Sequence, residues 1–384
     1  MNSDAVILIS PPYITVGPNS WTIMPPIPIE ADMVYHIRTS FLQYKKVPFF
    51  EPKWRISKTT TLGHFVHTVE KPYTKEIVPI ELDFDSIDRC FEDASKICDT
   101  INFLFLWNIE PHLSPSMDLI FEKINSYKKK KNVRILSIIP DAWPRIPDLT
   151  KLISSHTAIC DKTVTVYEGI IPYLISQNRK DLADKLDYFP CAFMSLNKEK
   201  IENKSTDFCY IGAINGSYEH RGFALELMQE SFPDKSFFVY TQGKTTNPEN
   251  ILSKTKDYID RVGDSQYSIV TSTRPTSFLN YDIQNYDNGY KNFHWPSVLP
   301  ARLAESIINM TIPVYVQFSK FDRMPASIDS YDAWIYIQAN DSADTIRQKI
   351  ESVPLDEMKK RMMKFYNDYI SPDVLIPKLL ERTK

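Results

Sequence analysis

Continuous apolar runs alternate along this chain with segments that have the apolar spacing of a helix. Ile101–Trp107 reads INFLFLW and Val133–Ile139 reads VRILSII, with few polar residues inside either run. A strand of this kind is buried on both faces, as in a parallel sheet that helices cover on either side. Just before the first run, Ile87, Phe91 and Ala94 recur at the spacing of a helix face. The alternation predicts an α/β fold with parallel sheets and crossover helices.

The alternation occurs twice, on either side of a polar stretch that is rich in lysine. Residues 1–75 come first, and prolines break them into short extended pieces that give no clear prediction. The polar stretch, SLNKEKIENKST, has the composition of an exposed linker. Strands are predicted again at Phe208–Ile211, Ser236–Tyr240, Tyr267–Thr271, Ile312–Val316 and Trp334–Gln338. We predict an N-terminal α/β domain over residues 1–192, a linker over 193–206, and a C-terminal α/β domain with closing helices over 207–384.

Composition narrows the class of protein. A chain of 384 residues fits two domains of ordinary size. The formal net charge of −3 carries no footprint of nucleic-acid binding at the level of the whole chain, so no nucleic acid is expected as a partner. The five cysteines are scattered without a C-x-x-C pair, which disfavours a zinc cluster or a disulfide framework. Because no signal peptide or membrane span is visible, we expect a soluble protein of a bacterial or viral-host cytosol.

The segment Leu299–Gln317, LPARLAESIINMTIPVYVQ, indicates a short helix that runs into a buried strand. Arg302 and Glu305 lie one helical turn apart, so both side chains can point the same way. Pro313 stands near the start of the strand, where the missing N–H is tolerated. Without a ligand, the Arg302 and Glu305 pair has a plain structural interpretation as an ion pair worth a few tenths of a kcal/mol.

This segment resembles the nucleotide-sugar-binding segment of GT-B glycosyltransferases. The usual form is an Arg-x-x-(Glu/Asp)-(Ala/Ser) helix followed by a Gly/Cys/Thr-Ile-Pro-Val strand, and the exostosin-like family has an especially similar version. Two positions depart from that version, because Glu305 replaces the more common Asp and Asn309-Met310 stands where small residues are usual. The matching residues are Ala301-Arg302-Leu303, Glu305-Ser306-Ile307 and Thr311-Ile312-Pro313-Val314.

The resemblance implies a GT-B-like fold, in which two Rossmann-like α/β domains face a cleft. It implies a hexosyl- or pentosyltransferase that moves a sugar from a nucleotide-diphosphate sugar to a hydroxyl of a glycan or other acceptor. The donor would bind to the C-terminal domain and the acceptor to the N-terminal domain. Positive side chains would neutralise the leaving diphosphate, so no cofactor is required, and a divalent metal is possible but not expected.

The candidate donor-binding residues follow the predicted strands of the C-terminal half, because ligands of open α/β sheets bind beyond the carboxyl ends of the strands. A glycine lets backbone N–H groups approach a diphosphate, and an arginine near a helix start can clamp it. Arg302 suits a bidentate phosphate grip, and Glu305 offers acceptor oxygens to ribose hydroxyls. Arg221 and Arg274 also fit ordinary exposed positions. The full set is Gly212, Ser217, Arg221, Gln242, Gly243, Arg274, Ser297, Arg302 and Glu305.

The catalytic residue is sought in the loops of the N-terminal half. An inverting transfer needs a carboxylate or histidine within reach of the acceptor hydroxyl, whereas a retaining transfer has no such need. Glu110 and His112 follow the run that ends at Trp107, and Asp141 follows the run that ends at Ile139. Loop carboxylates are also common as turn or helix caps. The sequence leaves the choice of inverting or retaining transfer open.

Three alternatives remain beside this interpretation. Asp83 and Asp85 form a strand-terminal Asp-x-Asp, the pattern by which a GT-A glycosyltransferase holds Mg²⁺ or Mn²⁺, although Asp85 also suits a helix cap. A non-catalytic carbohydrate-binding protein can use the same scaffold. A GT-B enzyme that glycosylates modified DNA bases is a further variant, and the near-neutral charge weighs against it.

Overall fold

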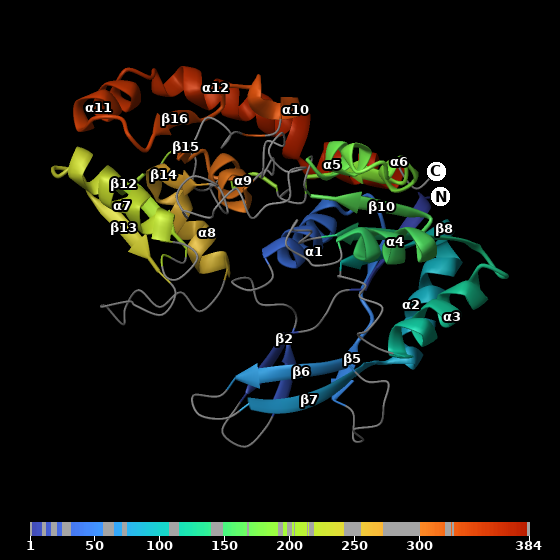
Figure 1. Ribbon diagram of the computed structural model, residues 1–384. Helices are drawn as coiled ribbons and strands as arrows, with labels where there is room; N and C mark the ends of the chain where they lie inside the picture. The colour runs from blue at the N-terminus through green and yellow to red at the C-terminus, as the bar shows by residue number, and fades with distance from the viewer. Residues whose placement is uncertain are drawn as a thin grey trace. The chain divides into compact units, whose positions relative to one another are not determined.

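The structure is a computed structural model, and the chain divides into two compact units (Figure 1). Unit 1 comprises residues 1–166, 180–189 and 376–384, and unit 2 comprises residues 167–179 and 190–375. Residues 167–179 and 190–192, predicted in the N-terminal domain, group with unit 2, and residues 376–384, predicted in the C-terminal domain, group with unit 1. The structure describes every residue except 1, 10–12, 17–20, 25–31, 57–64, 71–74, 107–114, 140–148, 167–168, 191–194, 198–201, 203, 213, 215–218, 242–254, 272–299, 319–323, 325 and 382–384.

Unit 1 contains a parallel sheet of six strands in the order β11-β10-β9-β8-β1-β4. The strands are β1 (Asn2–Ile9), β4 (Phe49–Phe50), β8 (Cys98–Leu106), β9 (Asn132–Ile139), β10 (Lys162–Thr165) and β11 (Leu186–Tyr188). The helices are α1 (Asp32–Tyr44), α2 (Phe84–Ile97), α3 (Pro115–Tyr127), α4 (Leu149–Ile159) and α6 (Lys180–Ala183). The predicted parallel sheet with crossover helices is confirmed in this half of the chain.

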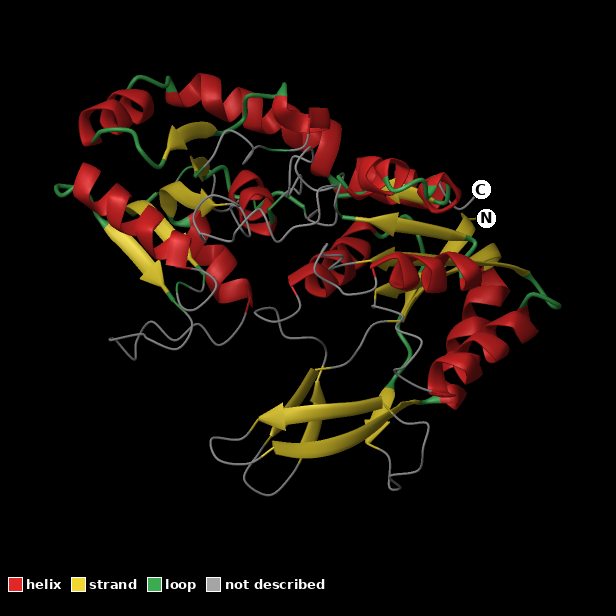
Figure 2. Cartoon of the chain, viewed as in Figure 1, coloured by secondary structure: helices red, strands yellow, loops and turns green. Residues whose placement is uncertain are grey.

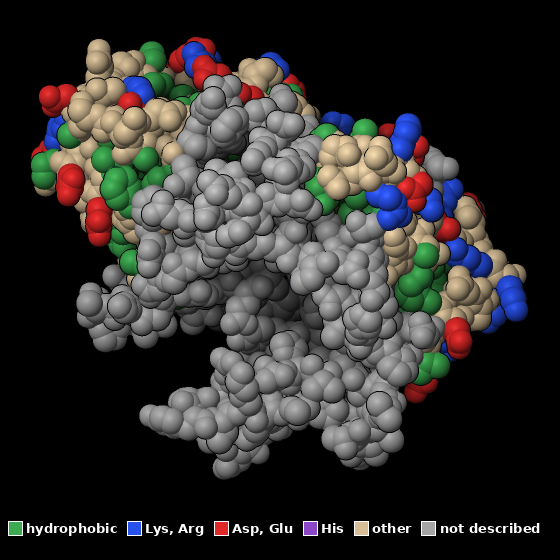
Figure 3. Space-filling model, in the orientation of Figure 1, with side chains coloured by type: hydrophobic (Ala, Val, Ile, Leu, Met, Phe, Trp, Pro, Cys, Tyr) green, Lys and Arg blue, Asp and Glu red, His purple; other side chains and the backbone are tan. Residues whose placement is uncertain are grey.

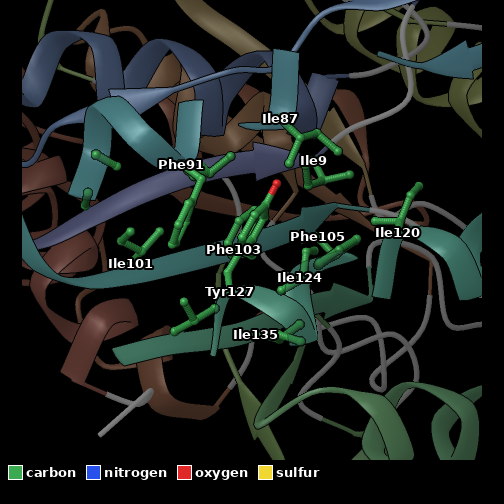
Figure 4. Close-up of a cluster of buried hydrophobic side chains, with 14 of the residues drawn as sticks. Ile9, Ile87, Phe91, Ile101, Phe103, Phe105, Ile120, Ile124, Tyr127 and Ile135 are labelled. Carbon is green, nitrogen blue, oxygen red and sulfur yellow. The ribbon is translucent and has the colours of Figure 1, made fainter. Parts of the chain in front are cut away.

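Both faces of this sheet are buried, as the continuous apolar runs predict. Ile9 of β1 packs in a cluster with side chains of helices α2 and α3 (Figure 4). Successive side chains of a strand point to opposite faces, so Leu8, which is 1% exposed, is buried on the other face of the sheet. Within the cluster the rings of Phe91 and Tyr127 stack at 4.0 Å between centroids. Residues 101–106 of the INFLFLW run therefore belong to strand β8, at the centre of a two-sided core.

Two antiparallel pieces are inserted into unit 1 (Figure 2). The hairpin of β2 (Tyr13–Val16) and β3 (Trp21–Met24) follows β1, and a second sheet, in the order β5-β7-β6, lies between β4 and α2 in the chain. Its strands are β5 (Trp54–Ile56), β6 (Phe65–Glu70) and β7 (Lys75–Leu82). A crossover helix begins at the edge where the preceding parallel strand ends. Both insertions therefore leave and rejoin the parallel sheet at its carboxyl edge.

Unit 2 contains a second parallel sheet, of five strands, in the order β13-β12-β14-β15-β16. The strands are β12 (Thr206–Ile211), β13 (Phe237–Tyr240), β14 (Ser265–Thr271), β15 (Ile312–Gln317) and β16 (Ile335–Gln338). The first helices are α5 (Ile170–Ser176), α7 (Glu219–Ser231), α8 (Thr255–Gly263), α9 (Ala301–Ile308) and α10 (Ala326–Asp329). The closing helices are α11 (Ala343–Glu351), α12 (Leu355–Phe365), the π-helix η6 (Tyr366–Ile370) and α13 (Pro372–Glu381), which groups with unit 1 from Ile376 on. No helix in the described ranges is long and apolar enough to cross a bilayer.

The strand order of unit 2 creates a switch point between β12 and β14. From β12 the chain crosses to β13 on one side, and from β14 it crosses to β15 on the other. Such crossovers are right-handed. Two crossovers that run in opposite directions across the sheet therefore place their helices on opposite faces. Helix α7 packs with α11, and α8 packs with α9, in agreement with this division. Ligands of open α/β sheets bind at the carboxyl ends of strands at such a point.

Lys204, in the stretch predicted as a linker, belongs to unit 2 and binds at the opposite, amino edge of its sheet. Its Nζ donates to the carbonyls of Gly263 and Asn309, both at 2.8 Å, and to Thr311 Oγ1 at 3.2 Å. Gly263 ends α8 and Asn309 caps the end of α9. One ammonium group thus satisfies carbonyls at two helix ends, where a positive charge is favourable.

Asn309 and Met310, which depart from the small residues of the resembling segment, have clear structural roles. The buried Asn309 amide donates to the carbonyls of Ile259 at 3.2 Å and Glu305 at 2.8 Å, which joins α8 to α9. Met310 has a φ of 49°, and its N–H donates to Ile307 at 3.0 Å. Together with a bond from the next N–H to the carbonyl of Ser306, this is a Schellman ending of α9.

Candidate active site

The candidate site lies at the carboxyl end of β12, at the switch point of unit 2. Gly212 directly follows β12, and its N–H donates to the carbonyl of Tyr240, at the end of β13, at 3.1 Å. An ideal Cβ added to Gly212 would lie 3.1 Å from Tyr210 Oη and 3.7 Å from Arg221 Nη1. The glycine thus leaves a space that a phenol oxygen and a guanidinium group both adjoin, beside an accessible stretch of backbone.

Arg302 reaches the same strand end from α9. Its Nε donates to the carbonyl of Ile211, the last residue of β12, at 3.1 Å, and its Nη1 pairs with Glu305 Oε2. The Glu305 side chain is 0% exposed, whereas that of Arg302 is 23% exposed. A buried carboxylate requires a partner, and Glu305 has one in Arg302. The ion pair expected from the spacing is therefore present, and it fixes the guanidinium against β12.

Two arginines from opposite faces of the sheet converge on this strand end. Arg221 belongs to the first turn of α7 and Arg302 to the first turn of α9. Both charges lower the pKa of Tyr210, but burial of the phenol outweighs them and raises that pKa to about 12. The phenol is therefore neutral at physiological pH, next to two permanent positive charges. This combination suits a small anion with more than one negative charge, such as a diphosphate.

The predicted residues divide into those the structure brings together and those it does not describe. Gly212, Arg221, Arg302 and Glu305 lie at one strand end, and their donor-binding role stays a prediction. The predicted ribose contact of Glu305 also stays a prediction, and its carboxylate pairs with Arg302. Outside the described residues lie the other predicted donor-binding residues, Ser217, Gln242, Gly243, Arg274 and Ser297, and all three candidate catalytic residues, Glu110, His112 and Asp141.

Asp83, the first residue of the Asp-x-Asp pattern, has a structural role in unit 1. It is the N-cap of α2, and its side chain accepts hydrogen bonds from the N–H groups of Asp85 at 3.1 Å and Ser86 at 3.4 Å. Within the described part of the chain, no group of three or more His, Cys, Asp or Glu side chains is arranged to hold a metal ion. The cap, together with the two parallel-sheet units, decides against the GT-A alternative.

Sequence reasoning missed Tyr210 and a group of three rings, those of Phe318, His220 and Phe223. Tyr210 passes for a core residue in an apolar strand, although the Tyr-x-Gly spacing places it on the face where Gly212 has no side chain. Phe318 follows β15, and its ring lies 5.7 Å from His220 and 6.1 Å from Phe223 of α7. Phe223 is 40% exposed.

Comparison with known proteins identifies the fold. No protein-family model matches the sequence, and no curated protein matches it. Three solved structures of α-glucosyltransferase match nearly the whole chain. The complex with UDP and a 13-mer DNA with a central A:G mismatch has a TM-score of 0.51 and 13% identity over 100% of both chains. The complex with UDP and a 13-mer DNA with an HMU base has a TM-score of 0.52 and 11% identity over 100% of both chains. The complex with UDP-glucose and DNA with an abasic site has a TM-score of 0.53 and 11% identity over 99% of both chains. The predicted GT-B-like α/β fold is confirmed, whereas none of these structures supports the exostosin-like family in particular.

The expectation that nucleic acid is excluded as a partner is wrong. All three of these structures contain DNA, so a protein of this fold binds nucleic acid. The expectation rested on a net charge of −3, which averages over the whole surface. DNA binding needs only a local positive potential along one face. Figure 3 shows both basic and acidic side chains on the described surface. A net charge near zero does not reveal how such charges are distributed.

Proposed function

We propose that this chain is a glycosyltransferase that takes its sugar from a nucleoside diphosphate sugar held at the carboxyl edge of the unit 2 sheet. The observation that carries the proposal is the convergence of Arg221 and Arg302 on the glycine end of β12. Two fixed positive charges at a switch point match a diphosphate in charge and position. UDP is the nucleotide we propose, because the α-glucosyltransferase structures hold UDP or UDP-glucose.

The two arginines serve the departure of the nucleoside diphosphate. As the bond between the anomeric carbon and the phosphate oxygen breaks, negative charge develops on the diphosphate. Arg302 is already held at the strand end by Ile211 and Glu305, and Arg221 Nη1 lies beside Gly212, so the two charges stabilise the diphosphate as it departs. Glu305 supports Arg302 from within the core, and its predicted contact with ribose hydroxyls is part of the proposal. This arrangement delivers transition-state stabilisation from the protein's own charges.

The acceptor is proposed to bind to unit 1. The carboxyl edge of its parallel sheet is where β8 and β9 end, where the loops with Glu110, His112 and Asp141 begin, and where the two antiparallel insertions emerge. A hydroxyl group placed there attacks the anomeric carbon, and one of those residues takes its proton if the transfer is inverting. Transfer of glucose in particular, which would make the enzyme a hexosyltransferase, belongs to the proposal.

Calorimetry with a panel of nucleotides tests the donor site. We expect UDP to bind the wild-type chain, and we expect Arg302→Ala and Arg221→Ala each to weaken that binding by about 10- to 100-fold, the effect of about 1.5–3 kcal/mol for one charge-assisted hydrogen bond. Arg347→Ala is the matched control, because Arg347 of α11 pairs with Asp234 and Glu351 rather than with the strand end. If none of UDP, ADP, GDP and TDP binds the wild-type chain, the proposal fails.

DNA is a second candidate for the acceptor, favoured by the DNA in all three similar structures. The test uses UDP-glucose labelled in the sugar and three acceptors: a 13-mer duplex with an HMU base, the unmodified duplex, and a mixture of free oligosaccharides. Label found only in the duplex with the HMU base supports a hydroxylated base in DNA as acceptor. Label found only in the oligosaccharides supports a glycan acceptor and removes DNA from consideration.

A further inference from the structure

Tyr210 occupies an unusual position for a core residue. Residues two apart in a strand share a face, so Tyr210 and Gly212 lie on the same side of the chain at the end of β12. The tyrosine is 3% exposed, yet its hydroxyl oxygen lies 3.1 Å from the place where a Gly212 Cβ would stand. Arg221 Nη1 lies 3.7 Å from that same place. The polar tip of the tyrosine therefore ends in the space that the missing side chain leaves open.

We propose that the Tyr210 hydroxyl is a donor-binding group, which donates a hydrogen bond to a phosphate oxygen of the nucleoside diphosphate beside Arg221 and Arg302. The inference rests on the proposed function and adds a residue to it. The three groups and the backbone at Gly212 make a diphosphate cradle, a name used here for Tyr210, Gly212, Arg221 and Arg302. Within the cradle, the arginines supply charge and the phenol supplies a directional neutral donor.

The protonation state of Tyr210 suits this role. Burial raises its pKa to about 12, although the charges of Arg221 and Arg302 act in the opposite direction. The phenol therefore keeps its proton throughout the pH range in which a transferase works. A phenolate would repel a phosphate, whereas a neutral phenol donates to it. Neither the tyrosine nor the arginines titrate near neutral pH, so the cradle keeps one charge state.

Gly212 has a matching function in the cradle. A Cβ at this position would stand within 3.1 Å of the Tyr210 oxygen, closer than nine in ten ordinary Cβ contacts. An alanine would therefore fill the space between the hydroxyl and the guanidinium, or displace one of them. The structure thus predicts that Gly212→Ala and Tyr210→Phe both weaken UDP binding, although the first substitution adds atoms and the second removes an oxygen atom.

The test is UDP binding by calorimetry to wild type, Tyr210→Phe, Gly212→Ala and the control Tyr267→Phe. Tyr267 is a half-buried tyrosine on β14, where its ring packs on Phe208 at 5.1 Å. We expect Tyr210→Phe to weaken UDP binding about 10-fold or more, the effect of a hydrogen bond to a charged group. Gly212→Ala should weaken it at least as much. Tyr267→Phe should bind UDP as wild type does.

Thermal melting and a fluorotyrosine at position 210 separate binding from packing. The fluorotyrosine keeps the hydroxyl, so it should retain UDP binding, including in the event that Tyr210→Phe proves too unstable to assay. If Tyr210→Phe folds and binds UDP within 2-fold of wild type, the inference is overturned while the donor site stands. If fluorotyrosine loses UDP binding with an unchanged melting temperature, the inference is also overturned. If the wild-type chain binds no nucleoside diphosphate, the proposed function itself fails, which is a distinct result.

Discussion

Replacement of Lys204 by methionine should destabilise unit 2 without touching the candidate active site. Lys204→Met keeps the apolar stem but removes the ammonium group that bonds to Gly263, Asn309 and Thr311. Hydrogen bonds to a charged group are worth about 1.5–3 kcal/mol each. Water can reach this half-buried position and replaces part of that loss. We therefore expect a cost of about 3 kcal/mol, equivalent to one such bond and part of a second.

Calorimetric melting and hydrogen exchange measure this cost. For a unit of this size, about 3 kcal/mol lowers the melting temperature by about 6–12 °C. Amide exchange should accelerate first at the ends of α8 and α9, because Lys204 holds both. Lys360→Met, at an exposed position of α12, is the control and should change stability by less than about 0.5 kcal/mol. A Lys204→Met chain that melts within 2 °C of the control would show that the three bonds carry no net stability, and the reasoning would be refuted.

Three further predictions concern other parts of the fold. His156 is buried against Ser137 at 2.5 Å, and burial lowers its pKa to about 3. The contribution of His156 to the free energy of unfolding is fully present above pH 6.5. It is lost as the pH falls toward 3, by about 1 kcal/mol per pH unit, because the side chain is then protonated only in the unfolded state. His156→Gln should flatten this pH dependence in urea titrations at pH 7.5 and pH 5. Asp83→Ala removes the cap of α2 and should cost about 1 kcal/mol in urea denaturation, whereas Asp83→Asn should retain most of it; equal stability of all three chains would contradict the capping role. Asn309→Ala leaves the carbonyl of Ile259 without its donor and opens a cavity, so we expect the free energy of unfolding in urea to fall by about 2 kcal/mol. An unchanged stability would contradict the role of the hydrogen bonds that the Asn309 side chain donates.

The sequence predicts the parallel sheets well because their strands are marked locally. The runs that become β8 and β9 are apolar on both faces, and such runs have few other stable placements. The pairing of Arg302 with Glu305 follows from helical spacing in the same direct way. These features depend on neighbours within a few residues, so they can be inferred without knowledge of the fold.

Features that depend on distant pairing escaped prediction. Strands β5, β6 and β7 stabilise one another across the chain, and prolines interrupt the local pattern that would reveal them. Helix α4 continues to Ile159 and β10 begins at Lys162, a division that the apolar residues between 158 and 166 do not mark. The proximity of Tyr210 to Arg221 becomes visible only when α7 brings Arg221 to the end of β12. In each case a tertiary contact decides what the local sequence leaves open.

The placement of the antiparallel insertions has a consequence for how this chain can change. The sheet β5-β7-β6 joins the rest of unit 1 at β4 and at α2, both at one edge, so its two attachment points stay where they are whatever lies between them. The entropic cost of a longer connection grows only by about 0.6 kcal/mol for each doubling of its length. Residues 51–83 therefore behave as an exchangeable cassette. Replacement of this cassette is expected to change the acceptor that we propose binds to unit 1, while the register of β1 with β8 and the arginines of unit 2 remain as they are.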